Sequence, residues 1–189
     1  KPQTAIRRRS VERKVPVDAL YMAFHMCNRF HAEYHVFDII TDLLSNGRSS
    51  RFIQTLVQEK KLFTSIDAYI SGSLDEGLLH ITGKPASGIT LEQAEEAVWQ
   101  ELDKLKTIPV AEEELEKVKN RYESEQIFNN INYLNVATNL AFFELLGHAE
   151  DINLEVGKYR SVTVGQIQDT ACRTFVPENC NILYYKAIK

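Results

Sequence analysis

Residues 46–69 read NGRSSRFIQTLVQEKKLFTSIDAY, and this stretch decides the expected fold. Asn46 and Gly47 can adopt positive φ, so together they are able to end a preceding helix. Ser49 or Ser50 can then accept hydrogen bonds from the free N–H groups at the start of a following helix. The first part of the stretch therefore predicts a helix stop, a glycine turn and a helix start.

The second part of the stretch changes its apolar period near residue 63. Apolar side chains at positions 52, 53, 56 and 57 recur at the spacing of one helix face. Lys60 and Lys61 place two cations at the negative end of this expected helix. Beyond residue 63, apolar and polar side chains alternate, which is typical of a half-buried strand. The expected unit is helix, glycine turn, helix, strand.

The flanking sequence predicts further helices and strands. The apolar run 19–26 is typical of a central strand covered on both sides, with His25 as a core histidine. Residues 32–44 have helical spacing, and a hairpin is expected with strands at 63–71 and 78–84. The remaining elements are expected as helices from residues 90 and 109, a break at 129–132, a helix at 163–175 and a strand at 181–187. The fold class expected is α+β, with one mostly antiparallel sheet of five or six strands and the helices packed on one face.

Composition bounds the class of protein. The chain has 189 residues, 44% of them hydrophobic, which is enough for one good core. It begins at Lys1 without Met, so we expect it to be part of a longer protein. The net charge of -4 argues against a nucleic-acid partner. No run approaches the ~18 apolar residues of a transmembrane segment. The sequence does not fix the compartment, and the expectation is a cytoplasmic one.

The N-terminal segment is locally basic. Residues 1–14 include Arg7, Arg8 and Arg9 and have little apolar character. We expect them to form a solvated linker that leads into the first strand. Residues 15–189 are then expected to form a single domain.

One histidine pair needs a test against metal binding. His31 and His35 are four residues apart and share a helix face, as zinc-binding histidines do. The acid that would poise a water on the metal stands one or three residues after the first histidine in the known zinc patterns. Glu33 stands two residues after it and points to the opposite face. We therefore expect solvated residues at a helix start here, and no metal or cofactor in this domain.

The central stretch resembles a signature of the M16 metallopeptidases, the pitrilysin or insulinase type. Their second, zinc-free half carries Gly-Gly-x-Ser-Ser-Arg-Leu-Phe-x-x-Leu before a strand. The pattern continues as Arg-Glu-x-x-Gly-Leu-Ala-Tyr, and the residues of this chain in register with it are Gly47, Ser49, Ser50, Arg51, Leu56 and Leu62. Later landmarks of the family are matched at residues 75–78 and 162–167. The order and spacing cover most of the chain.

The resemblance implies a partner and a substrate. In that family two such halves close around an unfolded peptide, and the first half carries the zinc ligands in His-x-x-Glu-His. This chain has no His-x-x-Glu-His, so alone it is not expected to hydrolyse peptides. The expected partners are a catalytic zinc-binding half, upstream in the same chain or as a separate subunit, and a peptide substrate.

The chain also departs from the family pattern. Many members carry an Arg and a Tyr, seven residues apart, that reach the substrate, and the match without gaps places Val57 and Thr64 there. A slip of one residue would place Gln58 and Ser65, so neither alignment keeps the pair. The candidate substrate-facing residues are Val57, Lys60, Lys61 and Thr64. Two functions stay open: the lid of an active zinc endopeptidase, or a non-catalytic scaffold subunit derived from one.

Overall fold

A single mixed sheet forms one layer of the protein. The computed structural model describes residues 3–72 and 74–188. The sheet order is β1-β5-β2-β4-β3; β1 and β5 are parallel, and the other neighbours are antiparallel. The strands are β1 (Arg7–Arg13), β2 (Ala19–Met26), β3 (Phe63–Ile70), β4 (Gly77–Pro85) and β5 (Cys180–Ala187).

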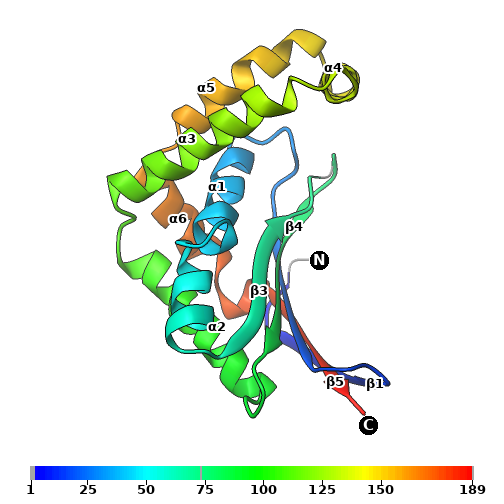
Figure 1. Ribbon diagram of the computed structural model, residues 1–189, viewed down its shortest axis with the longest axis vertical. Helices are drawn as coiled ribbons and strands as arrows, with labels where there is room; N and C mark the ends of the chain where they lie inside the picture. Colours follow the sequence, from blue (N-terminus) through cyan, green and yellow to red (C-terminus); the bar gives the residue numbers. More distant parts are fainter. Residues whose placement is uncertain (1–2, 73, 189) are drawn as a thin grey trace.

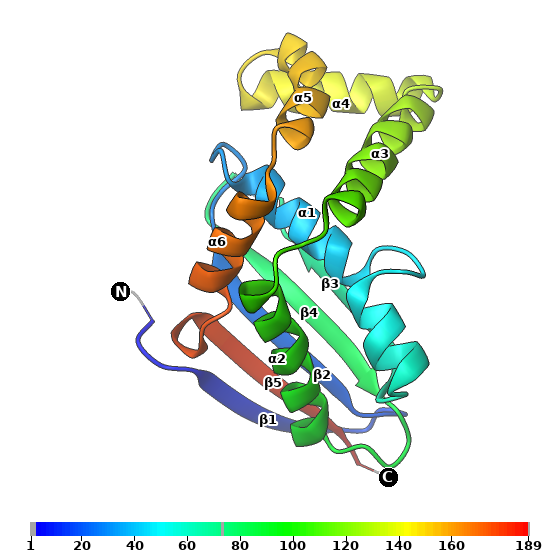
Figure 2. The same ribbon diagram turned by 90° about the vertical axis from the view of Figure 1, so that its left-hand side faces the viewer.

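Helices form the second layer, on one face of this sheet (Figure 1). The α-helices are α1 (Tyr34–Ser45), α2 (Leu91–Thr107), α3 (Glu112–Asn129), α4 (Tyr133–Leu146), α5 (Glu155–Arg160) and α6 (Val164–Thr174). The remaining helical segments are a π-helix, η1 (Phe52–Glu59), and two 3-10 turns, η2 (Ala149–Leu154) and η3 (Pro177–Asn179). Figure 2 shows α1, α2 and α6 lying across the sheet. The expected α+β architecture, with helices on one face, is confirmed.

Three α-helices and one 3-10 turn extend away from the sheet. Here α3, α4, η2 and α5 are called the helical arm, which stands beyond one end of the sheet (Figure 1). The break expected at the asparagine-rich segment is present, because α3 ends at Asn129 and α4 begins at Tyr133. In the part of the chain that is described, no helix is both long enough and apolar enough to cross a membrane.

The strand alternation builds the core between the layers. Along β2, Leu20, Met22 and Phe24 are fully buried against the helices, whereas Tyr21 and His25 are exposed on the opposite face. The expectation of a strand covered on both sides, with His25 in the core, is therefore wrong. The run of apolar residues hid a period of two, in which Tyr and His alternate with the larger aliphatic and aromatic residues. The face away from the helices is called the open face, and no helix of the described residues covers it (Figure 1).

The basic N-terminal segment is part of the sheet rather than a linker. Residues Arg7–Arg13 form the edge strand β1, which pairs in parallel with β5. A parallel edge strand with one neighbour buries little, so its sequence lacks an apolar face. Its partner lies more than 170 residues away, which is why local pattern did not reveal it.

The opposite edge of the sheet is capped by a side chain. Ser45, the last residue of α1, accepts from the Ala68 N–H at 2.9 Å, and its hydroxyl lies 3.0 Å from the Ala68 carbonyl oxygen. It occupies the place that a neighbouring strand would take beside β3. This contact satisfies the Ala68 N–H, which an edge strand otherwise leaves free.

Candidate functional site

The family-like turn is a structural joint. Gly47 has φ 94°, the left-handed conformation expected of it. The Ser50 hydroxyl donates to the Gly47 carbonyl at 2.7 Å, and the Ser49 hydroxyl accepts from Lys117. No side chain caps the N-terminus of η1, which begins after Arg51. The prediction that Ser49 or Ser50 caps the helix is wrong, because both hydroxyls are engaged elsewhere.

Arg51 connects this turn to the helical arm. Its guanidinium donates two hydrogen bonds to the Glu114 carboxylate on α3, at 2.9 and 2.8 Å. Planar pairing of this kind fixes the angle between two elements. Leu56 and Phe52 are fully buried beneath the joint. The matched motif therefore positions α3 against the sheet layer.

The candidate substrate-facing residues lie around the end of η1 and the start of β3. Val57 packs against the core, and Lys60 lies 3.5 Å from Glu101 of α2. Lys61 is exposed, with φ 52°, where the chain turns into β3. The Thr64 hydroxyl donates to the Lys84 carbonyl at 3.1 Å. Substrate contact by these four residues stays a prediction.

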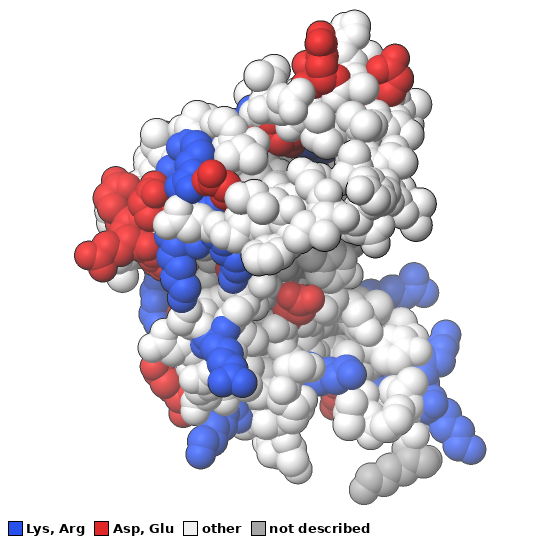
Figure 3. All heavy atoms as spheres, turned by 45° about the horizontal axis from the view of Figure 1, so that its top comes forward, with Lys and Arg blue, Asp and Glu red and all other residues white. Residues whose placement is uncertain are grey.

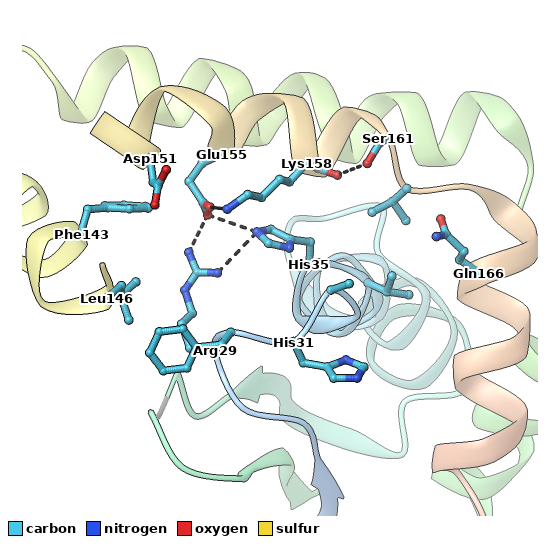
Figure 4. Close-up of a pocket in the computed structure, with 14 residues that line it drawn as sticks. Arg29, His31, His35, Phe143, Leu146, Asp151, Glu155, Lys158, Ser161 and Gln166 are labelled. Atoms are coloured by element: carbon cyan, nitrogen blue, oxygen red, sulfur yellow. Dashed lines mark hydrogen bonds and ion pairs between the residues drawn. The ribbon is translucent and has the colours of Figure 1, made fainter. Parts of the chain in front are cut away.

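An open pocket of about 400 Å³ lies where the helical arm meets α1 (Figure 4). Phe143 and Leu146 of α4 line one side, and Val36 of α1 and Val162 line another. Charged side chains occupy its floor. The pocket thus joins segments that are about 120 residues apart in sequence.

Glu155 is the centre of the charged floor. Its carboxylate accepts from Arg29 at 2.5 Å, from Lys158 at 2.8 Å and from His35 Nε2 at 3.2 Å, and Figure 4 shows the three side chains converging on it. Burial acts to raise the pKa of Glu155, but hydrogen bonds from His35, Lys158 and Arg29 outweigh it and lower the pKa to about 2. Arg29 also lies over the Tyr34 ring, 4.3 Å from its centroid. Glu155 is held as a carboxylate at any physiological pH.

A second, half-buried acid supports the same junction. The Tyr159 hydroxyl of α5 donates to the Asp38 carboxylate of α1, and the Tyr159 ring stacks on Tyr122 of α3. Burial raises the pKa of Asp38, and the bond from Tyr159 opposes that rise. Burial likewise raises the pKa of Tyr159. These contacts tie α1, α3 and α5 together.

The two histidines weighed as metal ligands are not a pair. His31 is exposed and points away from the cluster, whereas His35 is buried against Glu155 (Figure 4). The expectation that both are solvated is therefore wrong for His35. Among residues 3–72 and 74–188, no three His, Cys, Asp or Glu side chains come together as a metal site. The pocket is lined by two cations, Arg29 and Lys158, and two acids, Asp151 and Glu155, so its charges balance.

Comparison with known proteins agrees with the resemblance in the sequence. A family profile described as "Peptidase M16 inactive domain" matches residues 1–122. The chain belongs to this M16 inactive-domain family. Comparison with curated proteins found no match.

Solved structures share the fold of this M16 inactive domain. A protease from Helicobacter pylori superposes with a TM-score of 0.92 at 19% identity, over 98% of this chain and 45% of that one. The inactive peptidase domain of a zinc protease from Bordetella parapertussis superposes with a TM-score of 0.83 at 18% sequence identity, over 95% of this chain and 97% of that one. A chain of complex III from Candida albicans superposes with a TM-score of 0.78 at 15% sequence identity, over 94% of this chain and 45% of that one. The chain therefore spans less than half of the Helicobacter protein.

The open face of this M16 inactive domain has its own shallow hollow. It measures about 380 Å³ and is lined by side chains of β2, β3 and β4, including Tyr21, Tyr69 and Lys84. Tyr69 stacks on His80, and Tyr21 meets Tyr185 edge to face.

Sequence reasoning missed the Glu155 cluster. Glu155 and Lys158 are spaced as an ordinary surface pair on a short helix, and nothing local marks the acid as buried. The available signal was Arg29, a lone arginine between the apolar strand β2 and the apolar helix α1. Its partner could only be found in three dimensions.

Proposed function

We propose that this M16 inactive domain is the accessory half of a zinc endopeptidase. It forms the lid and one wall of a substrate chamber, and a catalytic half, upstream in the same chain or separate, holds the zinc. When bound there, zinc supplies the activated water that attacks the peptide bond. The present chain supplies binding surface and closure.

The observation that carries this proposal is an apolar surface on the helical arm. None of the α4 residues is buried. The exposed apolar side chains of the arm that stand out are Ile127, Phe128, Ile131, Tyr133, Leu134 and Leu145, each between 63% and 90% exposed. Figure 3 shows few charged atoms over this part of the molecule. Apolar surface of this extent is a mark of a protein interface.

The length of the relatives suggests what covers the arm. The chain spans 45% of the Helicobacter pylori protease that it resembles in fold. The rest of such a protein offers a second half of about the same size. Covering the arm with that half leaves the open face of the sheet free, and we assign the chamber wall to the open face.

The test is reconstitution. The candidate catalytic half is mixed with this chain, and cleavage of a quenched fluorescent peptide is followed. We expect cleavage only with both halves, and a loss of about tenfold or more for Ile131→Glu/Leu134→Glu. The matched control is Val17→Glu/Ile108→Glu, which charges two exposed apolar residues outside the arm. Full activity of the catalytic half alone would reject the lid role.

A scaffold is the second candidate function. Two observations favour it: Val57 and Thr64 stand where many M16 members have the substrate-contacting Arg and Tyr, and a complex III chain shares the fold. Val cannot clamp a peptide carbonyl as Arg does. Stable binding between the two halves without any cleavage would support the scaffold.

A further inference from the structure

The arginines of β1 have different environments on the helix face and on the open face of the sheet. Arg8 points to the helix face and pairs with Glu95 of α2 at 2.7 Å. Arg7, Arg9 and Arg13 alternate with it and point to the open face. All three are exposed, and within residues 3–72 and 74–188 none of them pairs with a carboxylate.

The rest of the open face adds to this positive charge. Lys84 of β4 is exposed there as well. On the open face of the five strands, Asp67 is the acidic residue, and its carboxylate is bonded to Ser45 at 2.8 Å at the β3 edge. Figure 3 shows basic atoms gathered on the side where Figure 1 places β1 and β5. The chain has a net charge of -4, so this face departs in sign from the whole molecule.

β1 is the edge of the sheet opposite β3. The β3 edge is capped by Ser45 at Ala68. In the described part of the chain, no side chain or loop takes that place beside Arg7–Val11. The Arg13 carbonyl accepts from the Ile188 N–H on the β5 side. Because alternate residues of a parallel strand direct their backbone groups to the same side, the Ser10 N–H and C=O face outward.

We propose that the β1 edge binds an extended peptide segment with acidic side chains at alternate positions. Such a segment adds to the sheet as a sixth strand through backbone hydrogen bonds. Side chains two residues apart on a strand are about 6.5 to 7 Å apart, so alternate acids meet Arg7 and Arg9 in register. Opposite side chains on neighbouring strands approach within about 5 Å, which is close enough for ion pairs.

The chemistry of the edge selects against other occupants. An uncharged or basic strand leaves the three arginines of β1 unpaired or repelled, which disfavours its addition. A nucleic-acid strand carries its charge at one phosphate per residue, without the alternation that the sheet face presents. The segment is the substrate of the chamber, and that identification rests on the function proposed above.

The experiment measures binding to this chain alone by fluorescence anisotropy. The probe is a labelled ten-residue peptide of alternating Glu and Thr. The comparison probes are a peptide of alternating Lys and Thr, a block peptide with the same Glu and Thr content, and a labelled short RNA. We expect the alternating acidic peptide to bind most tightly, and its affinity to fall as salt rises.

Two variants distinguish the contribution of the arginine charges to peptide binding from that of the backbone hydrogen bonds. Arg7→Gln/Arg9→Gln should weaken binding about fivefold or more, whereas the control Arg48→Gln/Lys104→Gln, which removes the same charge from the helix side, should change it less than about twofold. Ser10→Pro keeps every charge and removes an outward N–H at an edge position that tolerates proline, so it should also weaken binding.

Several results would overturn the proposal. They are equal binding of the acidic and basic peptides, equal losses in the test and control variants, and tighter binding of a short RNA than of the acidic peptide. The measurement needs no catalytic half. Failure to reconstitute cleavage with acidic binding intact therefore counts against the proposed function alone, and the reverse outcome counts against this inference alone.

Discussion

At the scale of single residues, Glu155 decides how the helical arm is held. Three cationic or hydrogen-bonding side chains converge on one buried carboxylate. Removing one partner of such a buried cluster leaves an unpaired buried charge. The resulting loss of stability is larger than the net stability that the intact cluster contributes. Glu155→Gln should therefore lower the free energy of unfolding by about 3 kcal/mol at neutral pH.

The pH dependence follows from the lowered pKa of Glu155. Its folded pKa of about 2 lies below its ordinary value of 4.5, so its contribution is present above pH 4.5 and is lost as the pH falls toward 2. The difference in free energy of unfolding between the wild type and Glu155→Gln should therefore become smaller as the pH falls across that range. Urea unfolding at several pH values measures it. The control is Glu150→Gln, an exposed acid on η2, and an equal effect of both variants would refute the assignment.

At the scale of elements, the Arg51 joint sets the position of α3. Lysine at this position keeps the charge but cannot make two parallel bonds to Glu114. Both side chains are partly exposed, so we expect Arg51→Lys to cost about 1 kcal/mol of stability. Arg48→Lys, three residues earlier, makes the same chemical change without a described ion pair to lose. Urea midpoints that fall equally for both would show that the pair contributes nothing.

Local pattern predicted most elements but not all of their environments. The periods around Gly47 gave the order of turn, helix and strand, because steric and hydrogen-bonding preferences act over a few residues. β1 escaped prediction since its partner β5 lies at the other end of the chain. The Ser50 hydroxyl was expected to cap η1 but instead bonds the Gly47 carbonyl. The sequence shows which residues carry polar groups, but the hydrogen-bond partners of those groups are set by tertiary contacts.

At the scale of the whole molecule, the helical arm exposes large apolar side chains to water. The isolated chain should bind a hydrophobic dye and associate at high concentration, because water contacts the large side chains of α4. We expect Ile131→Glu/Leu134→Glu to reduce dye fluorescence severalfold. Val17→Glu/Ile108→Glu should leave it nearly unchanged. Dye fluorescence and size-exclusion chromatography measure both, and equal changes in the two variants would locate the apolar surface elsewhere.

The cap that Ser45 places on Ala68 has a consequence for growth of the sheet. A sheet whose two edges both accept strands can stack copy upon copy into a fibre. Here one edge is closed by a hydroxyl, and at the other the exposed Arg7, Arg9 and Arg13 would face like charges in an antiparallel pair of copies. Polymerisation is thus stopped twice, by different physical means. Growth beyond a strand added at β1 would therefore depend on the outer edge of that added strand and not on either edge of this chain.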